Sequence, residues 1–199
     1  GVAESKVSVI PNYVITDVFK PFPGRTVNKK RLCFVRLDEV KDPMLLLDAV
    51  KGLDVELDMI GGGALLHAVQ KRVDKLGIAA RFIDTIPNDH LPEYFNSAAA
   101  IVCTSRYEGQ RKVLLEAMAC GVPVIGVDVR GVGDVIQHDV TGYVCERTPE
   151  GVRQAIQAVL GDDSLRERLG QNARQFAVEQ LDIKRIVELE LGVLGSLFR

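Results

Sequence analysis

The chain has 199 residues, 47% of them hydrophobic and 26% charged, which is the composition of a globular protein large enough for one substantial domain. Its formal net charge of -2 gives no overall electrostatic reason to expect a nucleic acid or an anionic membrane as a partner. Any site for an anionic ligand must therefore be local.

The four cysteines, Cys33, Cys103, Cys120 and Cys145, are widely spaced and form no C-x-x-C pair. Each lies in an apolar run, which is typical of small buried side chains in a reducing compartment, so we expect neither a disulfide nor a zinc site. No basic-then-apolar leader opens the sequence, and the least polar stretch, 117–127, is too short to span a bilayer. We expect a soluble, cytoplasmic protein without an integral membrane segment.

The first 28 residues are interpreted as a linker. Residues 5–10 alternate in polarity and predict a short strand, which a turn at Pro11-Asn12 ends. The sequence Pro21-Phe22-Pro23-Gly24 then has the composition of a connecting segment. This region does not resemble the start of a self-contained fold.

From there on, apolar runs alternate with helical patterns. Strands that are apolar throughout and separated by helices indicate a parallel sheet covered on both faces. The predicted fold class is therefore α/β, with a doubly wound, Rossmann-like parallel sheet followed by C-terminal helices. The predicted strands are 32–35, 55–60, 81–86, 98–103, 123–127 and 143–145, and the predicted helices are 44–50, 64–76, 89–97, 113–120, 150–160, 164–179 and 183–197, with a short helical turn at 132–137.

Three of the predicted loops follow strands and carry polar or glycine-rich sequence. In doubly wound sheets ligands bind at the carboxyl ends of the strands, so we expect loops 36–41, 61–63 and 105–111 to converge. Arg36 and Lys41 would there face a helix N-terminus, an arrangement that suits a diphosphate; the alternative is two solvated loop charges. The glycines at 61–63 lack the G-x-G-x-x-G spacing and are a weak signal by themselves.

The helix predicted at 113–120 is apolar on every side except at Glu116. Such a helix is buried, so the Glu116 carboxylate should lie in a place poor in water, where it needs hydrogen-bond donors. These donors are either protein groups or hydroxyl groups of a ligand. The chemistry alone therefore predicts a binding domain for a phosphorylated, hydroxyl-rich ligand.

Glu108 and Glu116 are separated by seven residues, within a segment that starts Ser105-Arg106-Tyr107 and continues to Gly121-Val122-Pro123. This segment resembles the E-x7-E signature of group 1 (GT4-like) retaining glycosyltransferases, which have the GT-B fold. Further matches with that family are 9–12, 34–37 together with Lys41, 60–63, 131–136 and 141–143.

The resemblance implies the C-terminal, donor-binding half of a GT-B enzyme. Residues 1–28 would be the interdomain linker with a short strand, 29–180 the nucleotide-sugar-binding domain, and 181–199 a helix packed on an N-terminal acceptor domain that the chain lacks. The substrate implied is a UDP- or GDP-sugar, without metal or permanently bound cofactor, and peripheral contact with the inner membrane face stays open. This chain alone would bind the donor without transferring its sugar.

The resemblance also implies roles for single residues. Arg36 and Lys41 would neutralise the donor diphosphate, which gathers negative charge as it leaves. Glu116 would accept hydrogen bonds from the ribose, Glu108 would hold a hydroxyl of the transferred sugar, and 83–86 would lie beside the nucleobase. The catalytic residues implied are Arg36, Lys41 and Glu108, and the further binding residues are Gly61, Ile83, Ile86, Gly109, Gln110, Arg111, Val113 and Glu116.

Several positions depart from the family pattern. Tyr13, Val35 and Asp84 stand where the family usually has glycine, and Arg111 and Lys112 replace small or apolar residues. The departures leave two explanations, a donor with additional negative charge or a site that no longer turns over. The alternative function is then a catalytically inactive GT-B-like binding or regulatory module, and a GT-B epimerase or phosphorylase is a third reading.

Overall fold

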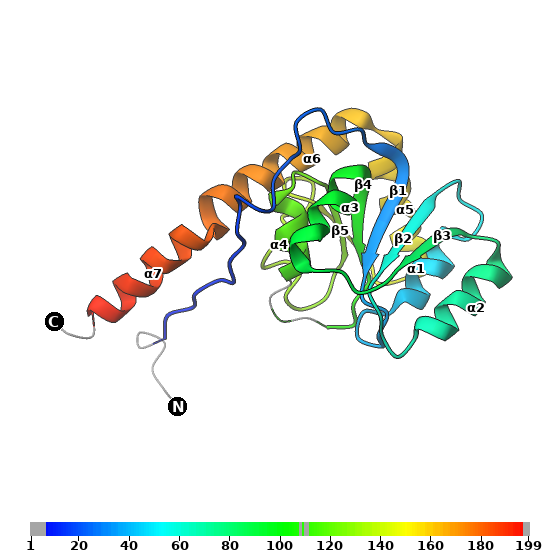
Figure 1. The fold of residues 1–199 in the computed structure, drawn as a ribbon, viewed down its shortest axis with the longest axis horizontal. Helices are drawn as coiled ribbons and strands as arrows, with labels where there is room; N and C mark the ends of the chain where they lie inside the picture. The colour runs from blue at the N-terminus through cyan, green and yellow to red at the C-terminus, as the bar shows by residue number, and fades with distance from the viewer. Residues whose placement is uncertain (1–6, 108, 110–111, 197–199) are drawn as a thin grey trace.

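The computed structural model describes residues 7–107, 109 and 112–196. Within these residues six strands form one sheet in the order β3-β2-β1-β4-β5-β6, and each neighbouring pair is parallel (Figure 1). The chain order of the strands reverses direction between β1 and β4, so the predicted doubly wound sheet is confirmed. The strands are β1 (Asn28–Val35), β2 (Glu56–Ile60), β3 (Ala79–Ile83), β4 (Ala98–Cys103), β5 (Val124–Val127) and β6 (Tyr143–Cys145).

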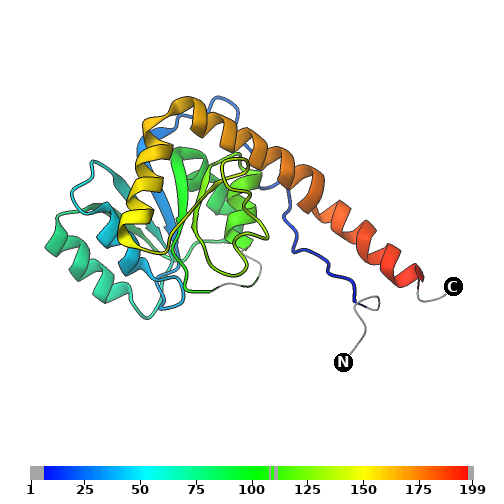
Figure 2. The same ribbon diagram turned by 180° about the vertical axis from the view of Figure 1, so that it is seen from behind.

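Helices cover both faces of this sheet (Figures 1 and 2). One face packs against α1 (Pro43–Val50), α2 (Leu66–Leu76) and α5 (Pro149–Gly161). The opposite face packs against α3 (Leu91–Ser97), which the 3-10 turn η2 (Asn88–His90) precedes, and against α4 (Lys112–Ala119). The chain ends with α6 (Asp163–Phe176), the π-helical turn η3 (Ala177–Leu181) and α7 (Ile183–Ser196).

The two faces hold separate hydrophobic clusters, because successive side chains of a strand point to opposite sides. In β1, Leu32 and Phe34 belong to the cluster beneath α1, α2 and α5, whereas Cys33 belongs to the cluster beneath α3 and α4. All three side chains are buried. This explains why the strand sequences are apolar at nearly every position instead of every second one.

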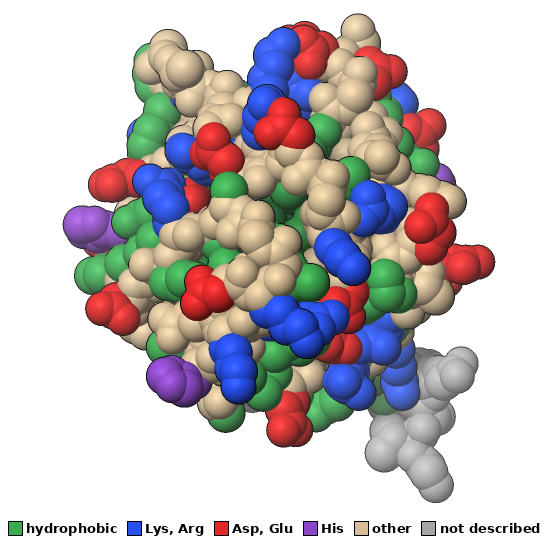
Figure 3. Space-filling model, turned by 90° about the vertical axis from the view of Figure 1, so that its right-hand side faces the viewer, with side chains coloured by type: hydrophobic (Ala, Val, Ile, Leu, Met, Phe, Trp, Pro, Cys, Tyr) green, Lys and Arg blue, Asp and Glu red, His purple; other side chains and the backbone are tan. Residues whose placement is uncertain are grey.

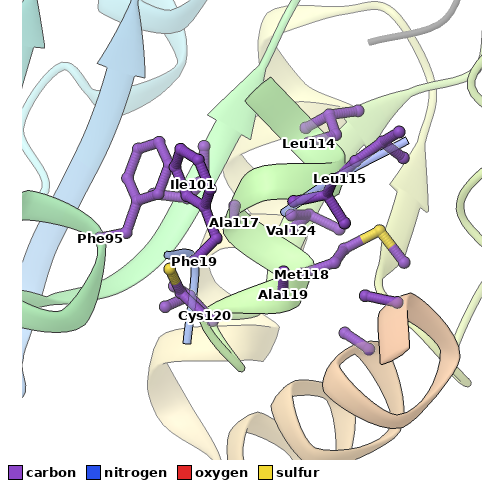
Figure 4. Packing of buried hydrophobic residues seen from close by; sticks show 14 of the residues in the cluster. Phe19, Phe95, Ile101, Leu114, Leu115, Ala117, Met118, Ala119, Cys120 and Val124 are labelled. Carbon is purple, nitrogen blue, oxygen red and sulfur yellow. The ribbon is translucent and has the colours of Figure 1, made fainter. Parts of the chain in front are cut away.

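Helix α4 lies at the centre of the second cluster and is buried from Leu114 to Ala119 (Figure 4). Its side chains meet Phe19 from the N-terminal segment (residues 7–27), Phe95 from α3 and Ile101 from β4 (Figure 4). A helix enclosed on all sides needs apolar residues all round, as the sequence predicted. Among the buried residues of α4 itself, Glu116 is the one that can carry a charge.

Two arginines fasten the N-terminal segment to the C-terminal end of α4. Nη1 of Arg174, from α6, donates to the carbonyl oxygens of Phe19 at 2.9 Å and Ala119 at 2.8 Å. Arg25 donates from Nη1 to the carbonyl oxygen of Cys120 at 2.8 Å and from Nη2 to that of Gly121 at 3.0 Å. The carbonyl groups at a helix end lack partners within the helix, and here guanidinium groups supply them.

Residues 5–10 do not form the predicted strand over the part that the structure describes, 7–10. The nearest extended pairing is an isolated bridge between Val14 and Asp182. A strand forms where its backbone groups can pair with a neighbouring strand, and the described residues offer no such neighbour beside 7–10. The alternating polarity of this segment could not reveal that. Strand β3 also lies earlier than predicted, at 79–83 instead of 81–86.

The four cysteines are free thiols, in agreement with the absence of any predicted disulfide. Cys33 and Cys120 are fully buried, whereas Cys103 and Cys145 are only partly so. Burial raises the pKa of Cys120 to about 12, because a thiolate would lose its hydration there. Cys120 therefore packs as a small protonated side chain rather than acting as a nucleophile.

Helix α7 and the N-terminal segment project side by side away from the body of the domain (Figures 1 and 2). Of the described side chains of α7, Ile186 is the buried one, while Val187, Leu191 and Leu194 are 44%, 62% and 52% exposed. None of the helices among the described residues combines the length and the apolar character needed to cross a membrane.

Candidate functional site

The strand-end loops converge at the carboxyl edge of the sheet, as the sequence predicted. The loop after β1 is bound to the loop after β2, because the backbone N–H of Leu37 donates to the carbonyl oxygen of Gly62 at 3.1 Å. It is also bound to the loop after β4, since the N–H of Arg106 donates to the carbonyl oxygen of Val40 at 2.8 Å. The crossover of the chain between β1 and β4 is the position at which open α/β sheets bind ligands.

The glycines after β2 permit a close backbone approach. A Cβ atom at Gly63 would lie 2.1 Å from the carbonyl oxygen of Leu37, whereas one at Gly62 would meet nothing within 4 Å. Gly61 has φ +86 and donates its N–H to the carbonyl oxygen of Ile83, at the end of β3. The glycine cluster thus lets the ends of β1, β2 and β3 come together.

A cleft of about 470 Å³ opens at these strand ends. It joins the end of β1, the glycine turn and the segment that leads from β3 into α3. Among the predicted site residues, Arg36, Gly61 and Ile86 lie in its wall; the complete lining is Val35, Arg36, Ile60, Gly61, Gly62, Gly63, Thr85, Ile86 and Leu91. Ile83 contributes its backbone to this edge and packs its side chain against the core.

Glu116 is 1% exposed, so the predicted burial of its carboxylate is confirmed. Its Oε1 accepts a hydrogen bond of 3.0 Å from Nδ2 of Asn88. Its Oε2 is buried and has no hydrogen-bond partner within the described residues. Burial raises the pKa of Glu116, while the Asn88 hydrogen bond and the charge of Lys112 act in the opposite direction.

The two predicted phosphate-binding cations belong to the loop after β1. The side chain of Arg36 is 68% exposed, and its Nη2 lies 3.4 Å from Oδ2 of Asp38. Arg36 has φ +71, an unusual backbone conformation for a residue other than glycine. The backbone of Lys41 is fixed on both sides, by an N–H donated to Oδ1 of Asp38 and a carbonyl oxygen that accepts from Thr104.

Asp42 links the loops that follow β1, β4 and β6 at this edge of the sheet. It is buried in a left-handed backbone conformation, and its Oδ2 pairs with the guanidinium groups of Arg106 and Arg147. The side chain of Arg106 is 59% exposed. Figure 3 shows Lys and Arg side chains gathered on the lower part of one side of the molecule, with acidic side chains between them.

Two of the departures from the family pattern contact each other. Nζ of Lys112, at the start of α4, lies 5.2 Å from the ring centroid of Tyr13 in the N-terminal segment, which is a cation–π geometry. Of the other departures, Val35 lines the cleft and Asp84 is exposed. Lys112 is therefore occupied by a contact within the protein that the sequence did not predict.

Some predicted site residues cannot be placed. Glu108, Gln110 and Arg111 lie outside the described residues, so their predicted roles are not tested. Gly109 is exposed, and Val113 is half-buried and packs against the core cluster around α4.

Sequence reasoning missed Asn88, Asp42, Arg106 and Arg147. The first of these precedes an expected helix as an ordinary polar residue, and its spacing to Glu116 carries no local signal. The two arginines sit in loops after β4 and β6, far apart in sequence, and only the sheet order brings them to one carboxylate. The positive charges could be counted from the sequence, but their pairing could not.

The chain matches the sequence model of the family described as glycosyl transferases group 1 over residues 17–176. It is 37% identical over 140 residues to N-acetyl-alpha-D-glucosaminyl L-malate synthase of Bacillus anthracis, a match that covers 69% of this chain and 36% of that protein. It is 29% identical over 195 residues to the GDP-mannose-dependent alpha-(1-6)-phosphatidylinositol monomannoside mannosyltransferase of Mycolicibacterium smegmatis, covering 85% of this chain and 51% of the other. The chain thus spans about half or less of the length of these relatives.

Among solved structures, the chain is similar to HepE of Anabaena in complex with UDP and glucose. The TM-score is 0.86 at 20% sequence identity, and the match covers 95% of this chain and 57% of the other. At this level of identity the likeness establishes the shared GT-B-type fold alone.

Proposed function

The chain belongs to the group 1 glycosyl transferases, and we propose that it is the donor-binding part of an enzyme that moves a sugar from a UDP- or GDP-sugar to a hydroxyl acceptor. The transfer proceeds with retention of the anomeric configuration. The acceptor site belongs to a part of the enzyme outside this chain, since the relatives are about twice as long.

The observation that carries this proposal is the buried Oε2 of Glu116, which has no hydrogen-bond partner among the residues that the structure describes. A buried carboxylate oxygen without a donor costs the folded protein several kcal/mol unless something supplies the hydrogen bond. Because Asn88 occupies the other oxygen and belongs to the segment beside the cleft, a ligand in the cleft is the natural source of that donor. The ribose hydroxyls of a nucleotide have the required chemistry.

The cations at the end of β1 supply the second half of the donor site. Arg36 and Lys41 bind the diphosphate, and their charges matter more as the sugar–phosphate bond breaks and the leaving group becomes more negative. Relatives named as GDP-mannose-dependent and a structural neighbour that holds UDP support a nucleoside diphosphate as the leaving group. The nucleobase lies against Ile86 and the segment that follows β3.

Titration of the chain with UDP and with GDP by isothermal calorimetry tests the proposal. We expect binding of one or both, at least tenfold weaker in Glu116→Ala and in Lys41→Ala. Lys30→Ala is the matched control, because Lys30 is an exposed cation near the start of β1 whose ion pair with Asp54 is solvated. No measurable binding of either nucleotide to the unaltered chain would refute the proposal.

We propose that the rest of the enzyme covers the exposed apolar side chains of α7. Val187, Leu191 and Leu194 recur at spacings of four and three residues, so they form one stripe along the helix. The helix projects from the domain beside the N-terminal segment, where the chain would continue into a preceding domain (Figure 1). An apolar stripe of this kind favours coverage by another protein surface.

A further inference from the structure

We propose that Asn88 is a positioning residue that holds the Glu116 carboxylate so that Oε2 faces the ligand, and that it thereby sets the preference of the site for ribose over 2′-deoxyribose. This inference rests on the proposed function, because it concerns the same nucleotide site. It assigns a task to a residue outside the family motif. Asn88 itself is exposed, so changing it need not disturb the core.

The geometry divides the two oxygens of the carboxylate between protein and ligand. The 3.0 Å hydrogen bond from Nδ2 of Asn88 holds Oε1, and Glu116 as a whole is only 1% exposed. With Oε1 occupied, Oε2 is the oxygen left for a hydroxyl donor. Thr85 and Ile86 line the cleft, and Asn88 follows Ile86 by two residues, so the amide belongs to the chain segment that borders the cleft.

Asn88 also favours the ionised form of Glu116. Among the described residues, Lys112 at the start of α4 and Asn88 in η2 favour the ionised carboxylate. Cys120, which directly follows α4, is a protonated thiol close to it. Asp89 and His90, in the same turn as Asn88, are exposed. An ionised carboxylate accepts a stronger hydrogen bond from a hydroxyl group than a neutral one does. Removing the Asn88 amide therefore makes the Glu116 carboxylate a weaker hydrogen-bond acceptor and also removes the bond that holds its Oε1.

Binding of UDP and of 2′-deoxy-UDP, or of the guanine pair if GDP binds better, measures this role directly. The unaltered chain should prefer the ribonucleotide about tenfold or more, and Asn88→Ala should reduce the preference about tenfold. Asn88→Gln, whose amide can still donate, should restore part of it. Asp89→Ala is the matched control in the same turn and should leave the preference unchanged.

A pH series separates positioning from a merely structural role. The nucleotide phosphate titrates in every sample, so the quantity to compare is the affinity of each variant relative to the unaltered chain at the same pH. In Asn88→Ala the pKa of Glu116 rises further, so the relative affinity should recover as the pH increases. In Asn88→Asp two neighbouring carboxylates ionise as the pH increases, and the relative affinity should instead fall.

Opposite pH trends for the two variants, together with the reduced ribose preference, would support the inference. If the unaltered chain binds the nucleotide, either of two results would overturn the inference about Asn88 but not the proposed function. One is an unchanged preference for ribose in Asn88→Ala. The other is a loss of affinity in both variants that does not depend on pH. Absence of binding by the unaltered chain would overturn the proposed function and this inference with it.

Discussion

Glu116 is the residue at which stability and ligand binding oppose each other. Burial raises its pKa above the ordinary value of 4.5, so the folded chain holds this proton more tightly than the unfolded chain does. Stability then decreases as the pH rises from 4.5 through the folded-state pKa, and the cost of the buried charge is complete above that pKa.

Replacing Glu116 by Gln should therefore stabilise the ligand-free chain at neutral pH. We expect the melting temperature to increase by about 2–4 °C, the shift that about 1 kcal/mol produces in a domain of this size. Scanning calorimetry at several pH values checks this, and the difference between the two chains should disappear below pH 4.5, where both are neutral at this position. A variant that melts lower at neutral pH would show that the carboxylate is stabilised by groups outside the described residues.

The close backbone approach at Gly63 leads to a second prediction about a single residue. Gly63→Ala would bring a Cβ atom to 2.1 Å from the carbonyl oxygen of Leu37, so the loop after β1 must move. We expect a loss of about 1–3 kcal/mol in the free energy of unfolding, measured by urea denaturation. Gly62→Ala, with open space around the new methyl group, should change it by less than about 0.5 kcal/mol. Equal effects at both glycines would contradict the close approach.

At the scale of elements, α4 depends on side chains from other segments at its C-terminal end. Arg174→Ala removes the donor to the carbonyl oxygens of Phe19 and Ala119, and we expect a loss of about 2–3 kcal/mol in unfolding free energy. Arg168→Ala is the control on the same helix, because Arg168 is 48% exposed and pairs with exposed Asp139. Chemical denaturation of both variants should separate them clearly, and a loss as small in Arg174→Ala as in Arg168→Ala would refute this role.

The buried carboxylate of Asp58 on strand β2 leads to a further prediction. Asp58 is 1% exposed, and its two oxygens accept hydrogen bonds of 2.8 and 2.7 Å from Arg81 on β3. Asp58→Ala leaves a buried void and removes this link between neighbouring strands, so a loss of about 2 kcal/mol is expected. Asp54→Ala, at an exposed ion pair with Lys30, should cost less than about 0.5 kcal/mol. Thermal denaturation of both variants is the measurement, and a neutral Asp58→Ala would contradict the expected link.

The elements that the sequence predicted well are those whose environment is uniform along their length. The strand 98–103 and the helix around Glu116 are buried on all sides, so their apolar composition sufficed. The segment 5–10 showed a strand pattern, but pairing depends on a neighbour that local sequence cannot supply. The residues of the candidate site differ in the same way. The sequence predicted Arg36, Gly61 and Glu116 because they belong to recognisable motifs. It did not predict Asn88, which reaches Glu116 through the packing of α3 beside α4.

At the scale of the whole molecule, the exposed stripe on α7 should govern how the chain behaves in solution. The double variant Leu191→Ser/Leu194→Ser should lower concentration-dependent self-association, because these two side chains are 62% and 52% exposed. Its melting temperature should stay within about 1 °C, since neither side chain contributes to the core. Analytical ultracentrifugation over a concentration series measures the first effect. Loss of stability would show that the stripe packs on this domain.

The N-terminal segment is attached to both ends of the helix that carries Glu116. Tyr13 meets Lys112 at the beginning of α4, and Arg25 holds the carbonyl oxygens of Cys120 and Gly121 at its end. In mechanical terms the segment is a tether held at both ends of α4. A load applied ahead of Tyr13 would first reach the cation–π contact with Lys112 and then the backbone pairing of Val14 with Leu181 and Ile183. The guanidinium contacts of Arg25 and Arg174 at the C-terminal end of α4 would carry that load last.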